Sequence, residues 1–157
     1  MLLRKQSLFL LAAGILALIT WGFPVATYHQ AHEAFVFRTT GLYGANGVAL
    51  EHIVMKVPFS IILTILGLAL LVSITFYRNR PRQMRFVRGT YLLLLAMVAF
   101  LFITDNSVQA YLEVDGEVER HFGLSFFAPV VALILAFMAE RAIRSDEVLI
   151  RSVDRLR

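Results

Sequence analysis

The chain has 157 residues, of which 59% are apolar and only 17% are charged, and its mean hydropathy is +0.72. A soluble domain has about 45–50% apolar and about 25% charged residues, so this chain has too few polar side chains to cover a water-facing surface. We therefore expect a membrane protein. The sequence contains no cysteine, which excludes disulfide bonds, thiolate metal sites and thiol–disulfide chemistry.

Four apolar stretches are long enough to cross a bilayer core of about 30 Å as helices, which takes about 20 residues each. We place them at about residues 8–26, 57–77, 86–104 and 122–139. The first stretch follows two basic residues, as a signal peptide would, but its apolar run is too long and no A-x-A site follows, so we expect it to be retained. The expected fold is an all-α membrane protein, a bundle of four transmembrane helices forming one domain over residues 1–157.

The basic residues predict how the bundle is oriented. Twelve of the fifteen lie in the N-terminal segment, the second connection and the C-terminal tail, whereas seven of the eleven acidic residues lie in the first and third connections. Cytoplasmic segments of membrane proteins are enriched in Lys and Arg, so we expect both termini in the cytoplasm. The same rule accounts for the net charge of +4, and we therefore expect no nucleic-acid partner.

The predicted spans lack the groups that intramembrane chemistry needs. Apart from Arg88, which lies at the edge of the third span and is expected to reach the headgroups, they contain no Asp, Glu, Lys, Arg or His. Proton relays, ion-coupled carriers and haem sites require such side chains inside the bilayer. We therefore expect no cofactor, no catalytic residue and no enzymatic activity.

Small residues predict how the helices pack. Ala128, Ala132 and Ala136 recur every four residues on one face of the fourth span, and Ala13 and Ala17 repeat that spacing in the first. Small side chains let helix backbones approach closely in lipid. We expect these faces to pack inside the bundle, with a subunit interface as the alternative.

The two outer connections carry strand and turn signals. In the third connection, Asp115-Gly116 separates two β-prone runs, which predicts a hairpin over residues 108–121. In the first connection, residues 34–40 are a strand candidate and Asn46-Gly47 is a second turn signal. We expect the two connections to form a small extracytoplasmic β-sheet that caps the helices.

Histidines and acidic residues bracket the first connection. His29 and His32 are spaced i, i+3, so on one helical turn they could share a zinc ion, with Glu33 or His52 completing the site. The order His-x-x-His-Glu differs from that of a zinc protease. Solvated polar side chains at a membrane interface explain the pattern more simply, and we predict no metal site.

Arginines concentrate in the segments expected in the cytoplasm. The tail, residues 140–157, has an amphipathic pattern, so it either continues the fourth helix or lies along the membrane. Glu140, at the start of the tail, is spaced to pair with Arg144 one turn further on. The candidate contacts to lipids or partners are Arg78, Arg80, Arg82, Arg85 and Arg88 in the second connection and Arg144, Arg151 and Arg155 in the tail.

Three segments at the cytoplasmic edge form long motifs. They are Arg4-Lys-Gln-Ser-Leu-Phe-Leu-Leu-Ala-Ala, Phe76-Tyr-Arg-Asn-Arg-Pro-Arg-Gln-Met-Arg, and Met138-Ala-Glu-Arg-Ala-Ile-Arg-Ser-Asp-Glu-Val-Leu-Ile-Arg-Ser-Val-Asp-Arg-Leu-Arg. Together they resemble the domain of unknown function 4293 family, small four-span inner-membrane proteins of the Bacteroidota. Glu140 stands where that family usually has Asn. Pro81 interrupts the second connection, residues 78–88, which we call the basic loop. The resemblance implies four spans, cytoplasmic termini and a bacterial inner-membrane location, and it implies no activity.

Three functional hypotheses remain open on the sequence alone. The first is a non-enzymatic accessory or assembly subunit that docks other membrane-protein subunits, or a second copy of itself, through the basic loop and the tail. The second is a membrane protein that binds lipids or small molecules, holding anionic headgroups with the arginines of the second connection. The third, ranked last, is metal-dependent activity at the outer face.

Overall fold

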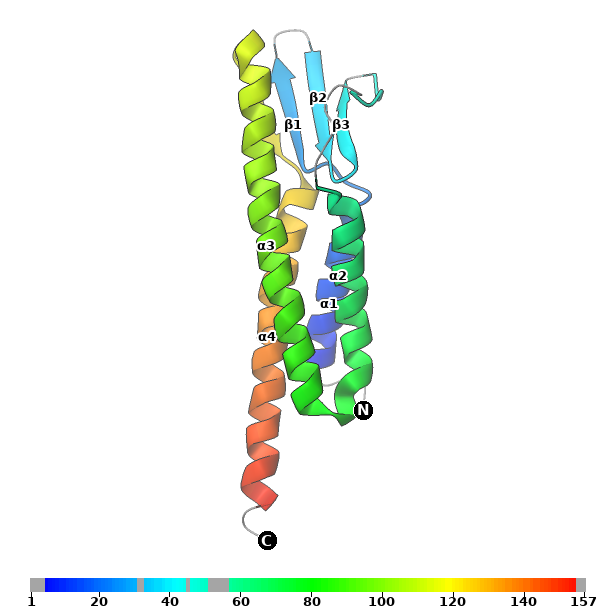
Figure 1. The fold of residues 1–157 in the computed structure, drawn as a ribbon, viewed down its shortest axis with the longest axis vertical. Coiled ribbons are helices and arrows are strands. Elements are labelled where there is room, and N and C mark those ends of the chain that lie inside the picture. Colours follow the sequence, from blue (N-terminus) through cyan, green and yellow to red (C-terminus); the bar gives the residue numbers. More distant parts are fainter. Residues whose placement is uncertain (1–4, 31–32, 45, 51–56, 155–157) are drawn as a thin grey trace.

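Three long apolar helices and a small antiparallel sheet make up most of the molecule (Figure 1). The computed structural model describes residues 5–30, 33–44, 46–50 and 57–154, without the side chains of Asp115 and of residues 149–154. The helices long and apolar enough to cross a membrane are α2 (Phe59–Ser73) with its 3-10 continuation η1 (Ile74–Arg78), α3 (Arg80–Leu112) and α4 (Leu124–Asp154). Helix α1 (Lys5–Ile19) is also apolar but has only 15 described residues.

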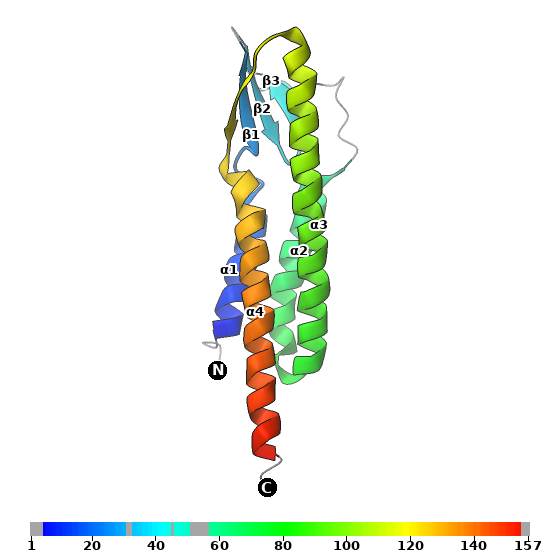
Figure 2. The same cartoon turned by 90° about the vertical axis from the view of Figure 1, so that its left-hand side faces the viewer.

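The four helices lie side by side. The sheet lies beyond one end of α1, α2 and α4, and the longer α3 continues alongside it (Figures 1 and 2). Helices α1 and α3 each pack against both α2 and α4. We call the end with the strands the sheet end. The opposite end, where α1 begins, α2 turns into α3 and α4 ends, is the tail end.

The sheet joins the two connections, as predicted. Strands β1 (Ala26–Gln30), β2 (Glu33–Arg38) and β3 (Gly41–Gly44) come from the first connection and β4 (Glu119–Phe122) from the third, in the order β3-β2-β1-β4. All neighbours are antiparallel, and Tyr28 of β1 lies between Phe35 of β2 and Arg120 of β4. The predicted Asn46-Gly47 turn is confirmed. Gly47 has φ +74°, which glycine adopts without strain, and its N–H donates to the Gly44 carbonyl at 2.9 Å.

The predicted hairpin over residues 108–121 is wrong. Helix α3 does not end near residue 104 but continues to Leu112, followed by the 3-10 turn η2 (Glu113–Asp115). Leu101, Asp105, Val108 and Leu112 are all buried at helical spacing, so one face of the helix stays covered beyond the predicted span. The second half of the predicted hairpin does form a strand, β4, but it pairs with β1.

The first predicted span is also shorter than expected, because α1 ends at Ile19 rather than near residue 26. Gly22 and Pro24 follow, and both disfavour a continuing helix. The carbonyl oxygen of Thr20 accepts hydrogen bonds from the hydroxyls of Thr39, at 3.4 Å, and Ser125, at 3.0 Å. Side chains from the turn between β2 and β3 and from the start of α4 therefore satisfy a carbonyl just past the end of α1.

Close helix packing centres on α1. The alanine rows at positions 13 and 17 of α1 and 128, 132 and 136 of α4 are all buried within the chain. A Cβ added to Gly14 would lie 2.7 Å from the Leu71 side chain and 3.1 Å from the carbonyl oxygen of Gly67. Helices α1 and α2 therefore approach closely enough to need glycine, the type of contact by which helices associate in lipid.

Candidate functional site

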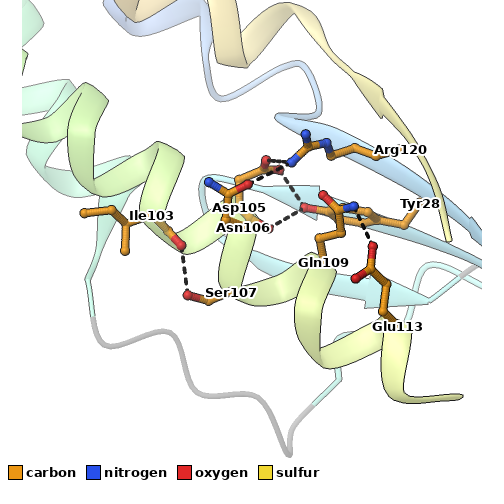
Figure 3. Close-up of polar contacts among 8 residues, drawn as sticks. All are labelled: Tyr28, Ile103, Asp105, Asn106, Ser107, Gln109, Glu113 and Arg120. Atoms are coloured by element: carbon orange, nitrogen blue, oxygen red, sulfur yellow. Dashed lines mark hydrogen bonds and ion pairs between the residues drawn. The ribbon is translucent and has the colours of Figure 1, made fainter. Parts of the chain in front are cut away.

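A buried carboxylate ties the sheet to α3 at the sheet end. Asp105 of α3 has no exposed surface, and both of its carboxylate oxygens are hydrogen-bonded. The Tyr28 hydroxyl of β1 donates to Oδ1 at 2.6 Å, and Nη1 of Arg120 in β4 donates to Oδ2 at 2.9 Å (Figure 3). One side chain of α3 therefore holds two neighbouring strands.

The guanidinium of Arg120 is engaged on several sides. Its Nη1 also donates to Oδ1 of Asn106 at 3.1 Å, and its Cζ lies 4.4 Å from the centre of the Phe122 ring, a cation–π distance. The side chain is 23% exposed. These contacts use the charges of the cluster internally, which favours a structural role for it over catalysis.

Tyr28 is held as a neutral hydrogen-bond donor. Burial, followed by the hydrogen bond to Asp105 and the charge of that carboxylate, raises the pKa of Tyr28 well above its usual value, and the nearby Arg120 opposes this only in part. Its phenol therefore stays protonated throughout the physiological range. From the sequence, Asp105 counts only as one of the acidic residues of the third connection. Its spacing from Leu101 and Val108 was the signal that it lies on the buried face.

The first connection does not place His29 on a helical turn, the arrangement in which it could share a zinc ion with His32. His29 lies in the extended strand β1 and is exposed, as is Glu33 of β2, whereas His32 and His52 lie outside the described residues. The ring of His29 instead contacts His121 of β4, with centroids 5.6 Å apart. Within the described ranges, no three His, Asp or Glu side chains are placed to share a metal ion.

At the tail end, one ion pair joins α3 to α4. Arg88 donates to Oε1 of Glu140, so this carboxylate pairs with a neighbouring helix instead of with Arg144 as predicted. The Glu140 side chain is 8% exposed, whereas that of Arg88 is 48% exposed. One turn closer to the middle of the bundle, the rings of Tyr91 and Phe137 pack edge to face with centroids 6.0 Å apart. The pair and the rings together fasten α3 to α4.

A groove lies where η1 meets the start of α3. Its volume is about 480 Å³, and it is lined by Asn79, Pro81, Arg82, Arg85 and Phe86. Asn79 caps α3, since its Oδ1 accepts a hydrogen bond from the backbone N–H of Arg82 at 3.4 Å. The ring of Phe86 packs edge to face on Phe76, with centroids 5.5 Å apart.

The arginines of the basic loop differ in whether a carboxylate pairs with them. Arg88 has Glu140, but in the described part of the chain no carboxylate pairs with Arg78, Arg80, Arg82 or Arg85. Arg82 and Arg85 are exposed at the groove. Nη1 of Arg80 is buried, and no acceptor for it is found among the described residues. The second connection therefore presents positive charge that the described carboxylates do not neutralise.

A second groove, of about 570 Å³, runs along the tail-end part of α4. It is lined by Phe137, Glu140, Arg141, Arg144, Ser145 and Val148. The tail continues the fourth helix, which was one of the two predicted alternatives, and it extends past the turn between α2 and α3 (Figure 1). The side chain of Arg151 and all of Arg155 lie outside the described residues.

With three helices that could span a membrane, the fold is compatible with an integral membrane protein. The family model described as Domain of unknown function (DUF4293) matches residues 2–156, so the chain belongs to this family. This confirms the resemblance seen in the three sequence motifs. Comparison with curated proteins and with solved structures found no match.

Proposed function

We propose that the chain crosses the bacterial inner membrane four times, with the sheet end outside and the tail end in the cytoplasm. Helix α1, whose 15 residues rise about 22 Å, packs against both α2 and α4 at the same height, so a bilayer that contains those two helices also contains α1. The arginines of the second connection and of α4 gather at the tail end, which supports a cytoplasmic location for it.

The outer surfaces of the helices support this placement. Large apolar side chains along the bundle are more than half exposed: Ile61, Ile65, Leu93, Ile103 and Ile134. An apolar surface of this kind is unfavourable in water and ordinary in lipid. Trp21, 52% exposed, lies where the helices give way to the sheet, and its Nε1 donates to Oγ1 of Thr64 at 2.7 Å. Tryptophan is enriched at the boundary between membrane and water.

Within this topology, the function that we propose is that of a non-enzymatic accessory or assembly subunit. It would dock a membrane-protein partner through the basic loop and the tail-end part of α4. The observation that carries the proposal is that α4 extends past the turn between α2 and α3, with Arg141 and Arg144 exposed along its groove. The proposal assigns no catalytic role because the predicted spans, apart from Arg88 at the edge of the third, lack the ionisable side chains that intramembrane chemistry requires.

Purification from native membranes in a mild detergent, followed by mass spectrometry, tests this role. We expect a membrane protein in stoichiometric amount with the wild type and with the control Arg38→Gln, which removes an exposed charge from the sheet. The double variant Arg141→Gln/Arg144→Gln should lose that partner while keeping its melting temperature. A monodisperse monomer without a stoichiometric partner would contradict the subunit role.

A further inference from the structure

We propose that the groove between η1 and the start of α3 binds the phosphate of an anionic phospholipid from the adjacent leaflet. The inference requires the tail end to lie at a membrane surface. It does not require the proposed docking of a partner protein.

The charges at the groove favour an anion. Arg82 and Arg85 both line it, lie three residues apart on one face of α3, and have no carboxylate partner in the described ranges. Like charges at this spacing repel each other, and an anion between them removes that repulsion. The planar guanidinium also fits phosphate oxygens with two parallel hydrogen bonds, so two arginines can hold one phosphate from both sides.

The backbone adds to this preference. The groove lies at the first turn of a 33-residue helix, where N–H groups lack partners within the helix and the helix dipole favours negative charge. One of these groups, the N–H of Arg82, already donates to Oδ1 of Asn79, and Pro81 has no N–H to donate. In the same turn, Arg80 carries a buried Nη1 that lacks an acceptor among the described residues. Arg80 does not line the groove, so at the groove itself the helix dipole and the two lining arginines favour an anion.

The apolar part of the groove indicates a lipid rather than a soluble phosphate. Pro81 and Phe86 form part of its lining, and Phe86 is 39% exposed although it packs on Phe76. Tyr77, in η1, is 53% exposed and precedes the lining residue Asn79 by two positions in the sequence. The groove therefore places two arginines next to apolar side chains at the start of α3, a helix of membrane-spanning length on which an acyl chain can lie. A soluble phosphate would contact the arginines alone.

Native mass spectrometry of the purified full-length chain, titrated with defined lipids in detergent, tests this inference. For the wild type, we expect one phosphatidylglycerol to bind in preference to phosphatidylcholine. We expect Arg82→Gln/Arg85→Gln to weaken that binding about 25-fold, since each arginine near an anionic leaflet contributes about 1 kcal/mol and 1.4 kcal/mol is tenfold. Both arginines are exposed, so the variant should fold, and an unchanged melting temperature checks this.

The matched control is Arg141→Gln/Arg144→Gln, which removes the same charge from the groove on α4. It should leave binding within about twofold of the wild type. Equal losses in the two double variants would show diffuse attraction to headgroups and overturn the inference. Inorganic phosphate provides the soluble arm of the test. If it displaces the lipid at millimolar concentration, or binds when phosphatidylglycerol does not, a soluble ligand is the occupant and the lipid assignment is wrong.

Discussion

The two ends of the molecule hold their charges in different ways. At the sheet end, Asp105 is fully buried and both of its oxygens are bonded within the chain. At the tail end, Glu140 neutralises Arg88, which is half exposed, while Arg82 and Arg85 have no carboxylate partner among the described residues. Breaking a buried and satisfied polar cluster costs stability, whereas exposed charges without partners remain available to a ligand. We therefore propose that the sheet end serves structural stability and that the tail end is where binding takes place.

The largest expected effect is that of Asp105→Ala. Removing the carboxylate leaves Arg120 mostly buried without its anion and leaves the Tyr28 hydroxyl unpaired, which should lower the free energy of unfolding by about 3–5 kcal/mol. Thermal unfolding in detergent measures the change. Glu113→Gln is the control, because Glu113 lies near the end of the same helix but is exposed. Similar melting temperatures for Asp105→Ala and the control would refute the structural role of the cluster.

Gly123→Ala tests the junction between the sheet and α4. A Cβ at this position would lie 2.2 Å from the carbonyl oxygen of Pro24, so the backbone must shift, at a cost of about 1–3 kcal/mol. In Gly89→Ala, the added Cβ meets nothing within 4 Å. That control should stabilise the protein by up to about 1 kcal/mol, since alanine favours a helix. Equal melting temperatures for the two variants would show that the close approach is absent.

Tyr28 makes the sheet end sensitive to alkaline pH. Its pKa is raised in the folded state, so its contribution to stability is complete below the unfolded value of about 10 and is lost as the pH rises above it. Tyr28→Phe should cost about 1 kcal/mol at neutral pH, the worth of one hydrogen bond, and should reduce the alkaline loss. Melting temperatures between pH 8 and pH 11 test this. Parallel pH profiles for the wild type and the variant would contradict the assignment.

The smallest effect is expected at the tail end, for Glu140→Gln. Water solvates the half-exposed Arg88 once its partner is gone, so the melting temperature should fall much less than with Asp105→Ala. The difference from the wild type should also shrink at high salt, because screening weakens the pair. A loss as large as that of Asp105→Ala would remove the contrast between the two ends.

Local patterns were sufficient to predict much of the fold. The apolar stretches containing α2 and α4 were located from their length, because a span must be long and apolar. The sheet was predicted in both connections from their strand and turn signals. The Asp115-Gly116 hairpin was wrong because Val108 and Leu112 continue the buried face of α3, and helical spacing determined the structure there in place of the turn signal.

The contacts that join distant segments could not be predicted. Arg88 and Glu140 lie 52 residues apart, and only the packing of α3 on α4 brings them together. The same holds for Tyr28 and Asp105, which lie 77 residues apart. The sequence around a carboxylate such as Asp105 gives no local sign of a partner that lies on a distant strand. For the groove that Arg82 and Arg85 line, the sequence located the charges. The groove itself depends on how η1 leads into α3.

The most direct test of the central claim, four crossings with the sheet end outside, is cysteine labelling of intact cells. The chain has no cysteine, so Val48→Cys and Ser145→Cys each introduce a single thiol at an exposed position. We expect a membrane-impermeant maleimide to label the Val48→Cys variant in intact cells and the Ser145→Cys variant only after permeabilisation. Labelling of both variants in intact cells, or the reverse pattern, would contradict the proposed topology.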